Sequence, residues 1–160
     1  MHHTQVARML DEEHRVNLDL LSRVENAMGR APSVTPELAA LLGRFAHAIE
    51  HDIGRHFQFE EEFLFPRMDD AGDGAMAALM TEEHRTIREV AAELLPLVQV
   101  VAAGGSDEES WDRLRMTTLE LVERQVAHIQ KETMALLPLL DDLLDAETDG
   151  QLALEYATAA

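Results

Sequence analysis

Hydrophobic residues recur every three to four positions along most of this chain, which is the spacing of one face of an α-helix. The pattern predicts four long helices, at about residues 4–28, 35–65, 75–102 and 107–144. Thr4 and Thr35 stand at the predicted N-caps of the first two helices. Long helices with short connections predict an all-α fold, an up-down-up-down four-helix bundle. The bundle is expected at residues 1–145, and the tail at 146–160 is expected to be a short helix or disordered.

Three prolines lie within these helical patterns. Proline has no backbone N–H, and its ring clashes with the preceding turn of a helix. We therefore expect the second helix to end or kink near Phe65, just before Pro66. The third helix is expected to bend or break at Pro96, and the fourth to kink or break at Pro138.

Polar side chains interrupt the apolar stripes at six positions. In the first helix, Leu10 and Leu18 lie one turn from His14 on either side. The six polar residues on the inner faces are His14, His56, Glu60, His84, His128 and Glu132. Each histidine lies near the middle of its helix, so antiparallel helices aligned at their ends bring all six into one layer of the bundle.

The same polar residues belong to two kinds of sequence repeat. Residues 56–66 and 128–138 both read His, three residues, Glu, five residues, Pro. Residues 12–15 and 82–85 both read Glu-Glu-His-Arg, so the copies are offset by 72 and 70 residues. Because residues four apart share one face of a helix, each long repeat presents an imidazole and a carboxylate side by side. The pattern indicates an internal duplication of a helical hairpin.

Composition and charge exclude several classes of partner and site. The chain has 160 residues, a formal net charge of −18 and no cysteine. Nucleic acid and anionic membranes are not expected as partners, because phosphate groups are bound by clustered Lys and Arg. Without cysteine, thiolate zinc sites, iron–sulfur clusters and disulfides are excluded. No apolar run approaches the roughly 20 residues of a membrane span and no secretion signal stands at the N-terminus, so a cytoplasmic location is expected.

Four imidazoles and two carboxylates need partners in an apolar interior, because unpaired buried charges are very costly. Arg88 and Arg124 each lie one turn from an inward histidine and are candidate counter-charges. A pair of bound metal ions is the simpler explanation. Imidazole suits iron, zinc, copper or nickel, and bridging carboxylates suit paired iron or manganese. Helix bundles hold such two-metal sites between Glu and His residues of facing helices.

These motifs resemble those of the hemerythrin-like family, the HHE cation-binding domains. The phrases HFQFEEEFLFP and HIQKETMALLP, interleaved with two EEHR phrases, are close to the repeated motif of that family over about residues 4–140. The resemblance implies a non-haem di-iron centre, two iron ions with an oxo or hydroxo bridge. It implies that one iron is held by His14 and His56, the other by His84 and His128, and that the bridging carboxylates are Glu60 and Glu132.

The motifs depart from those of oxygen-carrying hemerythrins at two places. Those proteins have a second histidine four residues after the one on the third helix, where this chain has Arg88. They also commonly end with HxxxxD, where this chain has HxxxE starting at His128. One nitrogen ligand is then missing, and an open position for dioxygen, peroxide or nitric oxide is expected. This favours redox chemistry or sensing over reversible oxygen carriage.

The resulting hypothesis is a di-iron protein that binds or reacts with dioxygen, peroxide or nitric oxide. Peroxidase or catalase-like turnover, or consumption of nitric oxide, is compatible with it, but no side chain stands out as a nucleophile and no catalytic residue is assigned. The alternatives are a non-enzymatic iron or oxygen sensor, an iron-handling protein, and a metal-free helical module that binds a partner protein. A homodimer through an outer helix face is left open.

Residues near the motifs have plainer expected roles. The flanking glutamates are expected on solvated helix faces; they are Glu12, Glu13, Glu61, Glu62, Glu82 and Glu83. Asp52, four residues before His56, is expected either to orient that histidine or to lie at the surface. The residues expected to wall the site are Phe45, Phe59, Phe63 and Met80. Trp111 and Tyr156 are too distant from the motifs in sequence to receive a role.

Overall fold

The computed structural model describes residues 2–31, 33–104 and 107–158, and every regular element in these ranges is a helix, as predicted. The α-helical segments are α1 (Gln5–Arg30), α2 (Pro36–His51), α3 (Phe65–Asp70), α4 (Gly74–Ala102), α5 (Glu108–Lys131), α6 (Leu137–Leu143) and α7 (Ala146–Thr158). Three π-helical segments are η1 (Asp52–Phe57), η2 (Glu60–Leu64) and η3 (Glu132–Leu136). Within the described ranges, no helix combines the length and apolarity that crossing a membrane requires.

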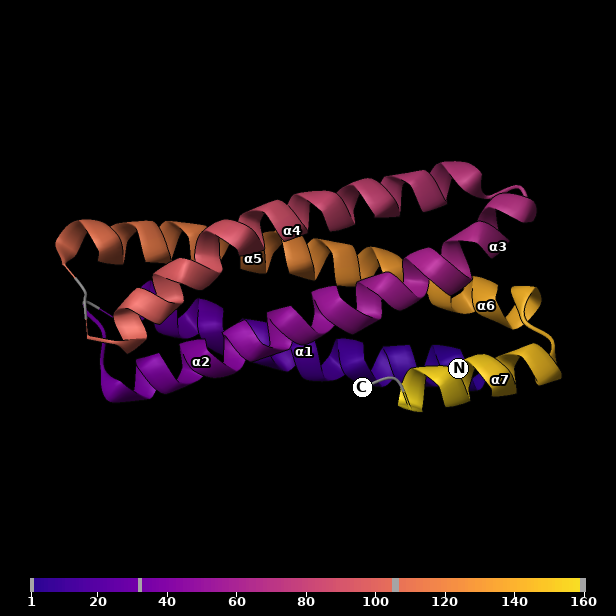
Figure 1. Ribbon diagram of the computed structural model, residues 1–160, viewed down its shortest axis with the longest axis horizontal. Coiled ribbons are helices and arrows are strands. Elements are labelled where there is room, and N and C mark those ends of the chain that lie inside the picture. The colour runs from indigo at the N-terminus through magenta and orange to yellow at the C-terminus, as the bar shows by residue number, and fades with distance from the viewer. Residues whose placement is uncertain (1, 32, 105–106, 159–160) are drawn as a thin grey trace.

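The long helical segments lie side by side and form an elongated molecule (Figure 1). α1 packs against α2 and α5, and α4 packs against the same two helices. α7 packs along α1, near the point where the chain begins. The long segments therefore enclose a common interior toward which their apolar stripes face.

The helix ends follow ordinary capping chemistry. The hydroxyls of Thr4 and Thr35 accept hydrogen bonds from the backbone N–H groups of Ala7 at 3.2 Å and Leu38 at 3.1 Å, as predicted. After α3, Gly72 adopts a φ of +93°, a left-handed conformation that glycine reaches without a Cβ clash. This allows a tight turn between α3 and α4.

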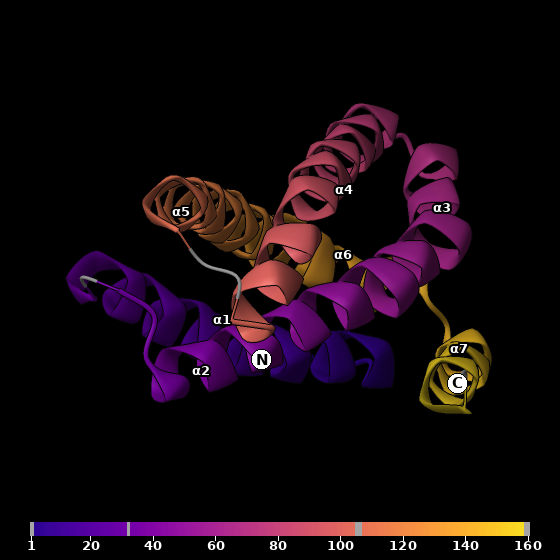
Figure 2. The same cartoon turned by 60° about the vertical axis from the view of Figure 1, so that its left-hand side comes forward.

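The helical segments continue past the three prolines. α3 begins at Phe65 with a proline in its first turn, and its axis turns away from that of the preceding segment (Figure 2). α6 begins at Leu137 in the same way. α4 runs through Pro96 and bends in that part of its length (Figure 1). The carbonyl of Ala92, which loses its helical donor there, belongs to an exposed residue and is open to water.

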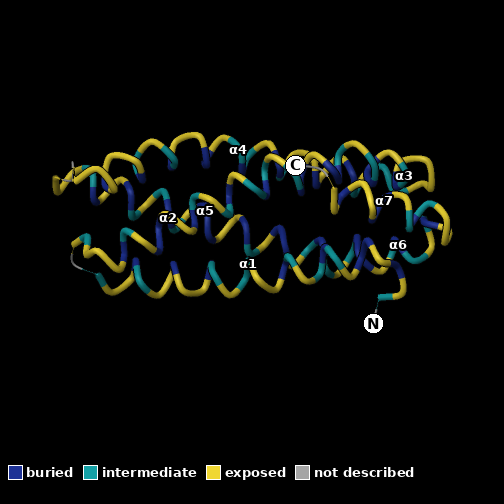
Figure 3. Tube along the Cα trace, turned by 60° about the horizontal axis from the view of Figure 1, so that its bottom comes forward, coloured by how far each residue is buried: buried dark blue, intermediate teal, exposed yellow. Residues whose placement is uncertain are grey.

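Two apolar cores fill the interior, and buried positions face inward along the long helices (Figure 3). Large buried side chains of the first core include Met28, Phe45, Leu94 and Leu114, and those of the second include Leu10, Met68, Met80 and Leu140. On α1, His14 lies between Leu10 of the second core and Leu21 of the first. Fully burying one such side chain contributes about 1.5–3 kcal/mol, so the two cores offset the cost of a polar layer between them.

A buried carboxylate holds α7 against the start of α1. Asp149 accepts hydrogen bonds from the backbone N–H groups of Gln5 at 2.9 Å and Val6 at 3.0 Å. These N–H groups belong to the first turn of α1, where a helix has no internal partner for them and favours negative charge. Leu152 and Tyr156 of α7 extend the contact, because both join the second apolar core.

Replacing Asp149 with alanine removes both hydrogen bonds to the first turn of α1. We expect the free energy of unfolding to fall by about 1–2 kcal/mol, the usual effect of losing a helix cap. Chemical denaturation followed by circular dichroism measures the change. Glu147→Ala, at an exposed position of the same helix, is the matched control, and an equal loss in both variants would contradict the capping role.

Candidate metal centre

The structure brings the six predicted polar residues together in one buried layer. Each of the four histidines and two glutamates is at most 2% exposed. They form two groups of four whose candidate ligand atoms lie within 4.8 Å of one another. Both groups contain Glu60 and Glu132; the first adds His14 and His56, and the second adds His84 and His128.

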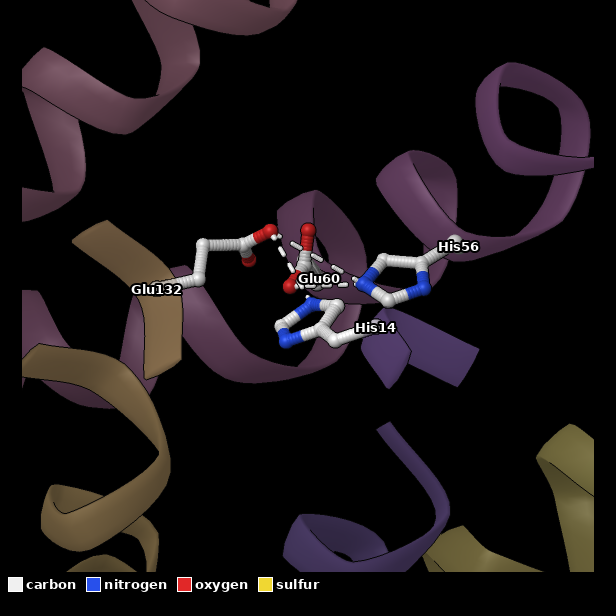
Figure 4. Close-up of side chains that lie close together, drawn as sticks. All are labelled: His14, His56, Glu60 and Glu132. Carbon is white, nitrogen blue, oxygen red and sulfur yellow. Dashed lines mark hydrogen bonds and ion pairs between the residues drawn. The ribbon is translucent and has the colours of Figure 1, made fainter. Parts of the chain in front are cut away.

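In the first group, two imidazole Nε2 atoms face two carboxylates (Figure 4). The Nε2 of His56 lies 3.1 Å from Glu60 Oε2 and 3.8 Å from Glu132 Oε1. The Nε2 of His14 lies 3.6 Å from Glu132 Oε1. The two imidazole rings stack with their centroids 5.2 Å apart. Both rings therefore direct the same nitrogen toward one small space.

The second group repeats this arrangement on the other helices. The Nε2 of His84 lies 3.2 Å from Glu60 Oε1, and the Nε2 of His128 lies 2.9 Å from Glu132 Oε1. The two Nε2 atoms are 3.0 Å apart. Glu60 thus turns Oε2 toward the first group and Oε1 toward the second, while Oε1 of Glu132 faces histidines of both. Each carboxylate lies between two sets of imidazoles.

Wide helical turns occur at the polar residues of two segments. His56 lies in η1, Glu60 begins η2 and Glu132 begins η3. A π-helical turn changes which side chains share a face of the helix, and such turns are frequent at functional sites. As a result Phe57 is fully buried, whereas Phe63, at regular helical spacing from Glu60, is only half-buried. Reasoning from a constant helical period missed these turns.

The other ring nitrogen of each histidine faces a side chain of a neighbouring segment. Carboxylate oxygens of Glu61, Glu83 and Glu13 lie 2.6, 2.8 and 3.4 Å from the Nδ1 atoms of His84, His128 and His56, respectively. Glu61 and Glu83 accept hydrogen bonds from the Nδ1–H groups of His84 and His128, which leaves the lone pair of each ring on Nε2, while the longer contact of Glu13 with His56 is an ion pair. The expectation of solvated faces is therefore wrong for these three glutamates. It is confirmed for the exposed Glu12, Glu62 and Glu82.

His14 makes the fourth outward contact, with a hydroxyl group. Its Nδ1 lies 3.0 Å from Thr133 Oγ1. That hydroxyl donates a hydrogen bond to the backbone carbonyl of Ile129 at 2.9 Å, so its oxygen is left to accept a hydrogen bond from Nδ1 of His14. The Nε2 of His14 is then unprotonated and faces the shared glutamates.

The outward contacts follow the duplication of the sequence. The second glutamate of each Glu-Glu-His-Arg repeat, Glu13 or Glu83, contacts the histidine of the long repeat that comes next in the chain. The residue after each shared glutamate, Glu61 or Thr133, contacts the histidine of the other hairpin. Glu13 and Glu83 are 70 residues apart, as are His14 and His84 beside them. This recurrence was the sequence signal that could have identified the two glutamates as part of the site.

A family model of the hemerythrin HHE cation-binding domain matches residues 5–140, which is most of the chain. The chain belongs to this family. A search of the curated proteins gives no match. Membership of a cation-binding family and the two buried groups of His and Glu together support metal binding in this layer.

Burial and neighbouring charges determine the protonation of the histidines in this hemerythrin-like domain. Burial, reinforced by a neighbouring histidine, lowers the pKa of His14 and His128 to about 4, so both rings are neutral near pH 7. Burial acts in the same direction on His56, but Glu60 and Glu13 outweigh it and raise the pKa of His56 well above its ordinary value. Burial alone would raise the pKa of Glu60, yet its contacts with His56 lower it, so this carboxylate is ionised.

Aromatic rings cover the second group. Phe57 stacks on His84, with the ring centroids 3.8 Å apart and the planes 3° from parallel. Phe65 lies near the same imidazole, at 5.3 Å between centroids. Of the residues predicted to wall the site, Phe45 and Met80 belong to the apolar cores, and Phe59 and Phe63 pack on each other.

The candidate counter-charges lie outside the polar layer. Arg88 donates to Glu61 Oε2 at 2.8 Å, so it supports the carboxylate that contacts His84. Arg124 is exposed and pairs with Glu120 at 3.4 Å, one turn away on the same helix. Arg88 therefore balances the charge of Glu61 on the outer side of His84, and Arg124 balances a glutamate at the surface.

Asp52 is buried, and both of its expected roles are wrong. Its carboxylate accepts hydrogen bonds from Asn17 at 2.9 Å and from Gln125 at 3.4 Å. Burial raises the pKa of this carboxyl group. Asp52 therefore joins a buried polar cluster beside the first core, where it neither orients His56 by a hydrogen bond nor faces solvent.

The chemistry of the polar layer fits metal ions. Within the part of the chain that the structure describes, the polar-layer atoms His14 Nε2, His56 Nδ1, Glu60 Oε1 and Glu132 Oε2 form no hydrogen bond. His84 Nε2 approaches Glu60 Oε1, but both atoms are acceptors when Nδ1 carries the proton. Each unpaired buried group costs about 1–3 kcal/mol, a large fraction of the stability of a domain. Four imidazole Nε2 atoms and two carboxylates around one space form a ligand set for cations that take nitrogen and oxygen.

Replacing Glu83 with glutamine weakens the acceptor for His128 Nδ1 without changing the size of the side chain. We expect the affinity for divalent metal to fall about 10–100-fold, because the imidazole becomes less basic and less well oriented. Competition with a chromophoric chelator measures this affinity. The neighbouring exposed substitution Glu82→Gln is the control, and wild-type affinity in both variants would contradict the orienting role.

Proposed function

We propose that this chain is a di-iron protein that binds or reacts with dioxygen, peroxide or nitric oxide. The observation that carries the proposal is that Glu60 and Glu132 belong to both buried groups of four. Two carboxylates shared between two pairs of imidazoles suit paired iron or manganese. The match to a cation-binding family supports a metal function. The proposed scaffold is the up-down-up-down four-helix bundle predicted from the sequence, with the ions at mid-length.

In the proposed centre, His14 and His56 hold one ion, His84 and His128 hold the other, and Glu60 and Glu132 lie between the two. The outer contacts favour a proton on the Nδ1 of each ring, so that Nε2 can bind a metal; on His56, the metal would displace the second proton of the ring. The apolar cores and the stacked ring of Phe57 keep bulk water away from the ligands. Bound iron supplies redox chemistry and Lewis acidity, which the side chains of this layer do not have.

The ligand set leaves a coordination position for a small molecule. Each group offers two imidazoles and the two shared carboxylates. Non-haem iron with two histidines, a carboxylate and open positions is the arrangement that reacts with oxygen. Arg88 occupies the position where oxygen-carrying hemerythrins have a further histidine, and its guanidinium binds Glu61 instead. This supports redox chemistry or sensing over reversible oxygen carriage.

A non-enzymatic iron or oxygen sensor is the second candidate. It is favoured by the origin of the ligands, which come from α1, from the segment of η1 and η2, from α4, and from the segment of α5 and η3. Bound ions then hold four stretches of the chain together, and their loss loosens the bundle. A metal-free module is distinguished by the metal-removal experiment below, and an iron-handling protein stays a further alternative. The homodimer and the cytoplasmic location stay predictions.

Reaction with peroxide and nitric oxide separates the two leading candidates. We expect the iron-loaded protein to consume one of these molecules over many turnovers, because the open position and the redox metal are both present. The zinc-loaded protein is the matched control, since zinc has no redox chemistry. An electrode for each molecule measures consumption. A single stoichiometric reaction would favour the sensor, and no reaction with either molecule or with dioxygen would contradict the proposal.

Metal removal tests the link between the ions and the fold. At a free iron concentration 100 times the dissociation constant, we expect each ion to stabilise the folded state by about 2.7 kcal/mol. Calorimetry or circular dichroism with and without ferrous iron under anaerobic conditions measures the shift. The Glu132→Ala variant is expected to lose most of this metal-dependent stabilisation. Unchanged melting of the wild type across this range would favour the metal-free module.

A further inference from the structure

The two duplicated halves of the centre differ in what supports their outer carboxylates. Glu83 forms an ion pair with Lys131. At the offset of the long repeat, the position that corresponds to Lys131 is Phe59, which has no charge. Glu13, the counterpart of Glu83, instead accepts a hydrogen bond from Tyr156 of α7. A residue outside the duplicated segments therefore takes the place of the lysine.

Tyr156 and His56 share one oxygen atom of Glu13. The tyrosine hydroxyl donates to Oε2 of Glu13, and the same oxygen lies 3.4 Å from His56 Nδ1. The other oxygen, Oε1, lies 3.0 Å from His51 Nε2. On its inner side, His56 Nε2 faces Glu60 at 3.1 Å. A continuous set of contacts thus runs from α7 to the shared glutamate.

Several contacts fix Tyr156 in this position. The residue is 6% exposed and belongs to the second apolar core. Its ring packs on Phe59 at 4.7 Å between centroids, and the Arg55 guanidinium lies 5.0 Å from its centroid. Arg55 also donates to the backbone carbonyl of Tyr156. Burial and the Glu13 carboxylate raise the pKa of Tyr156 well above its ordinary value, so the hydroxyl keeps its proton and donates a hydrogen bond to Glu13.

We propose that Tyr156 is a positioning residue that sets the metal affinity of the His14–His56 site by holding Glu13 against His56. The inference rests on the proposed metal function and adds a residue of α7 to it. The other two carboxylates, Glu61 and Glu83, have cationic partners of their own. Glu13 depends on the hydroxyl and on a histidine for its placement.

The surroundings of Glu13 give the direction of the effect. Its side chain is 25% exposed and lines an open groove of about 510 Å³. The groove is also lined by Arg8, His51 and Arg55, which all attract a carboxylate. Without the hydroxyl, Glu13 is free to turn toward these groups and toward water. His56 then loses the carboxylate that lies 3.4 Å from its Nδ1, its ring is less well oriented, and the site binds metal more weakly.

The His84–His128 site has no such dependence on α7. Its outer carboxylates are held by Arg88 and by Lys131, from α4 and α5. Loss of the tyrosine hydroxyl therefore changes one site and spares the other. A general loosening of the fold would weaken both sites together, which makes the difference between them the informative readout.

The test is Tyr156→Phe, which removes the hydroxyl and keeps the ring. Ferrous iron is titrated anaerobically against a competing chelator into the full-length wild type and variant. We expect one of two ions to bind about 10-fold more weakly in the variant and the other to change less than twofold. The same substitution is made in a Glu13→Ala background, where we expect no further loss, because the hydroxyl then has no carboxylate to hold. The melting temperature of each metal-free variant shows that it is folded.

The outcomes separate this inference from the proposed function. A wild type that binds no iron, or a single ion, would overturn the proposed function itself. A wild type that binds two ions, together with a Tyr156→Phe variant that binds both as tightly or both equally weakly, would overturn the positioning role alone. A tyrosine effect that persists at full size without Glu13 would also overturn it.

Discussion

Burial of four imidazoles and two carboxylates between two apolar cores is the constraint on which the rest of this molecule depends. The cores favour close packing of the helices, and the polar layer is costly unless every donor and acceptor in it has a partner. Three outward nitrogens form hydrogen bonds with Glu61, Glu83 and Thr133, and the fourth, on His56, forms an ion pair with Glu13. The inward nitrogens and carboxylates face one another around a shared space. A helix cannot slide or rotate past its neighbours without separating these groups, so the layer also specifies how the helices align.

Much of the fold and of the inner site could be predicted because each long helix must bury one face. On α1, the spacing of Leu10, His14 and Leu21 places all three inside, and the structure confirms this. The two repeats then identified the six polar residues without any knowledge of the packing. What failed was the assumption of a constant helical period. At η1 and η2 the turns widen, and Phe57 takes a place at the site that regular spacing does not predict.

The outer contacts were harder to predict for a different reason. Glu13 and Glu83 are adjacent in sequence to one histidine but contact another, on the neighbouring segment. Their partners depend on the register between helices, which periodicity along one helix does not contain. Tyr156 is more extreme, because only the docking of α7 on α1 brings it to Glu13. Sequence separation was the wrong criterion for leaving this tyrosine without a role.

Duplication does not make the two halves of the centre identical. Thr133 stands where the other half has Glu61, so one histidine has a hydroxyl acceptor and its counterpart a carboxylate acceptor. A carboxylate acceptor makes an imidazole a stronger metal ligand than a hydroxyl does. The half of the centre that contains His14 is thus the one with weaker outer support.

The central claim, that the polar layer holds two iron ions bridged by Glu60 and Glu132, is tested most directly by anomalous X-ray diffraction. Crystals of aerobically purified, untagged protein are measured on both sides of the iron absorption edge. We expect two iron peaks, each beside one pair of histidines, with both glutamates between them. No anomalous peak in this layer, or one that appears only at the zinc edge, would contradict it.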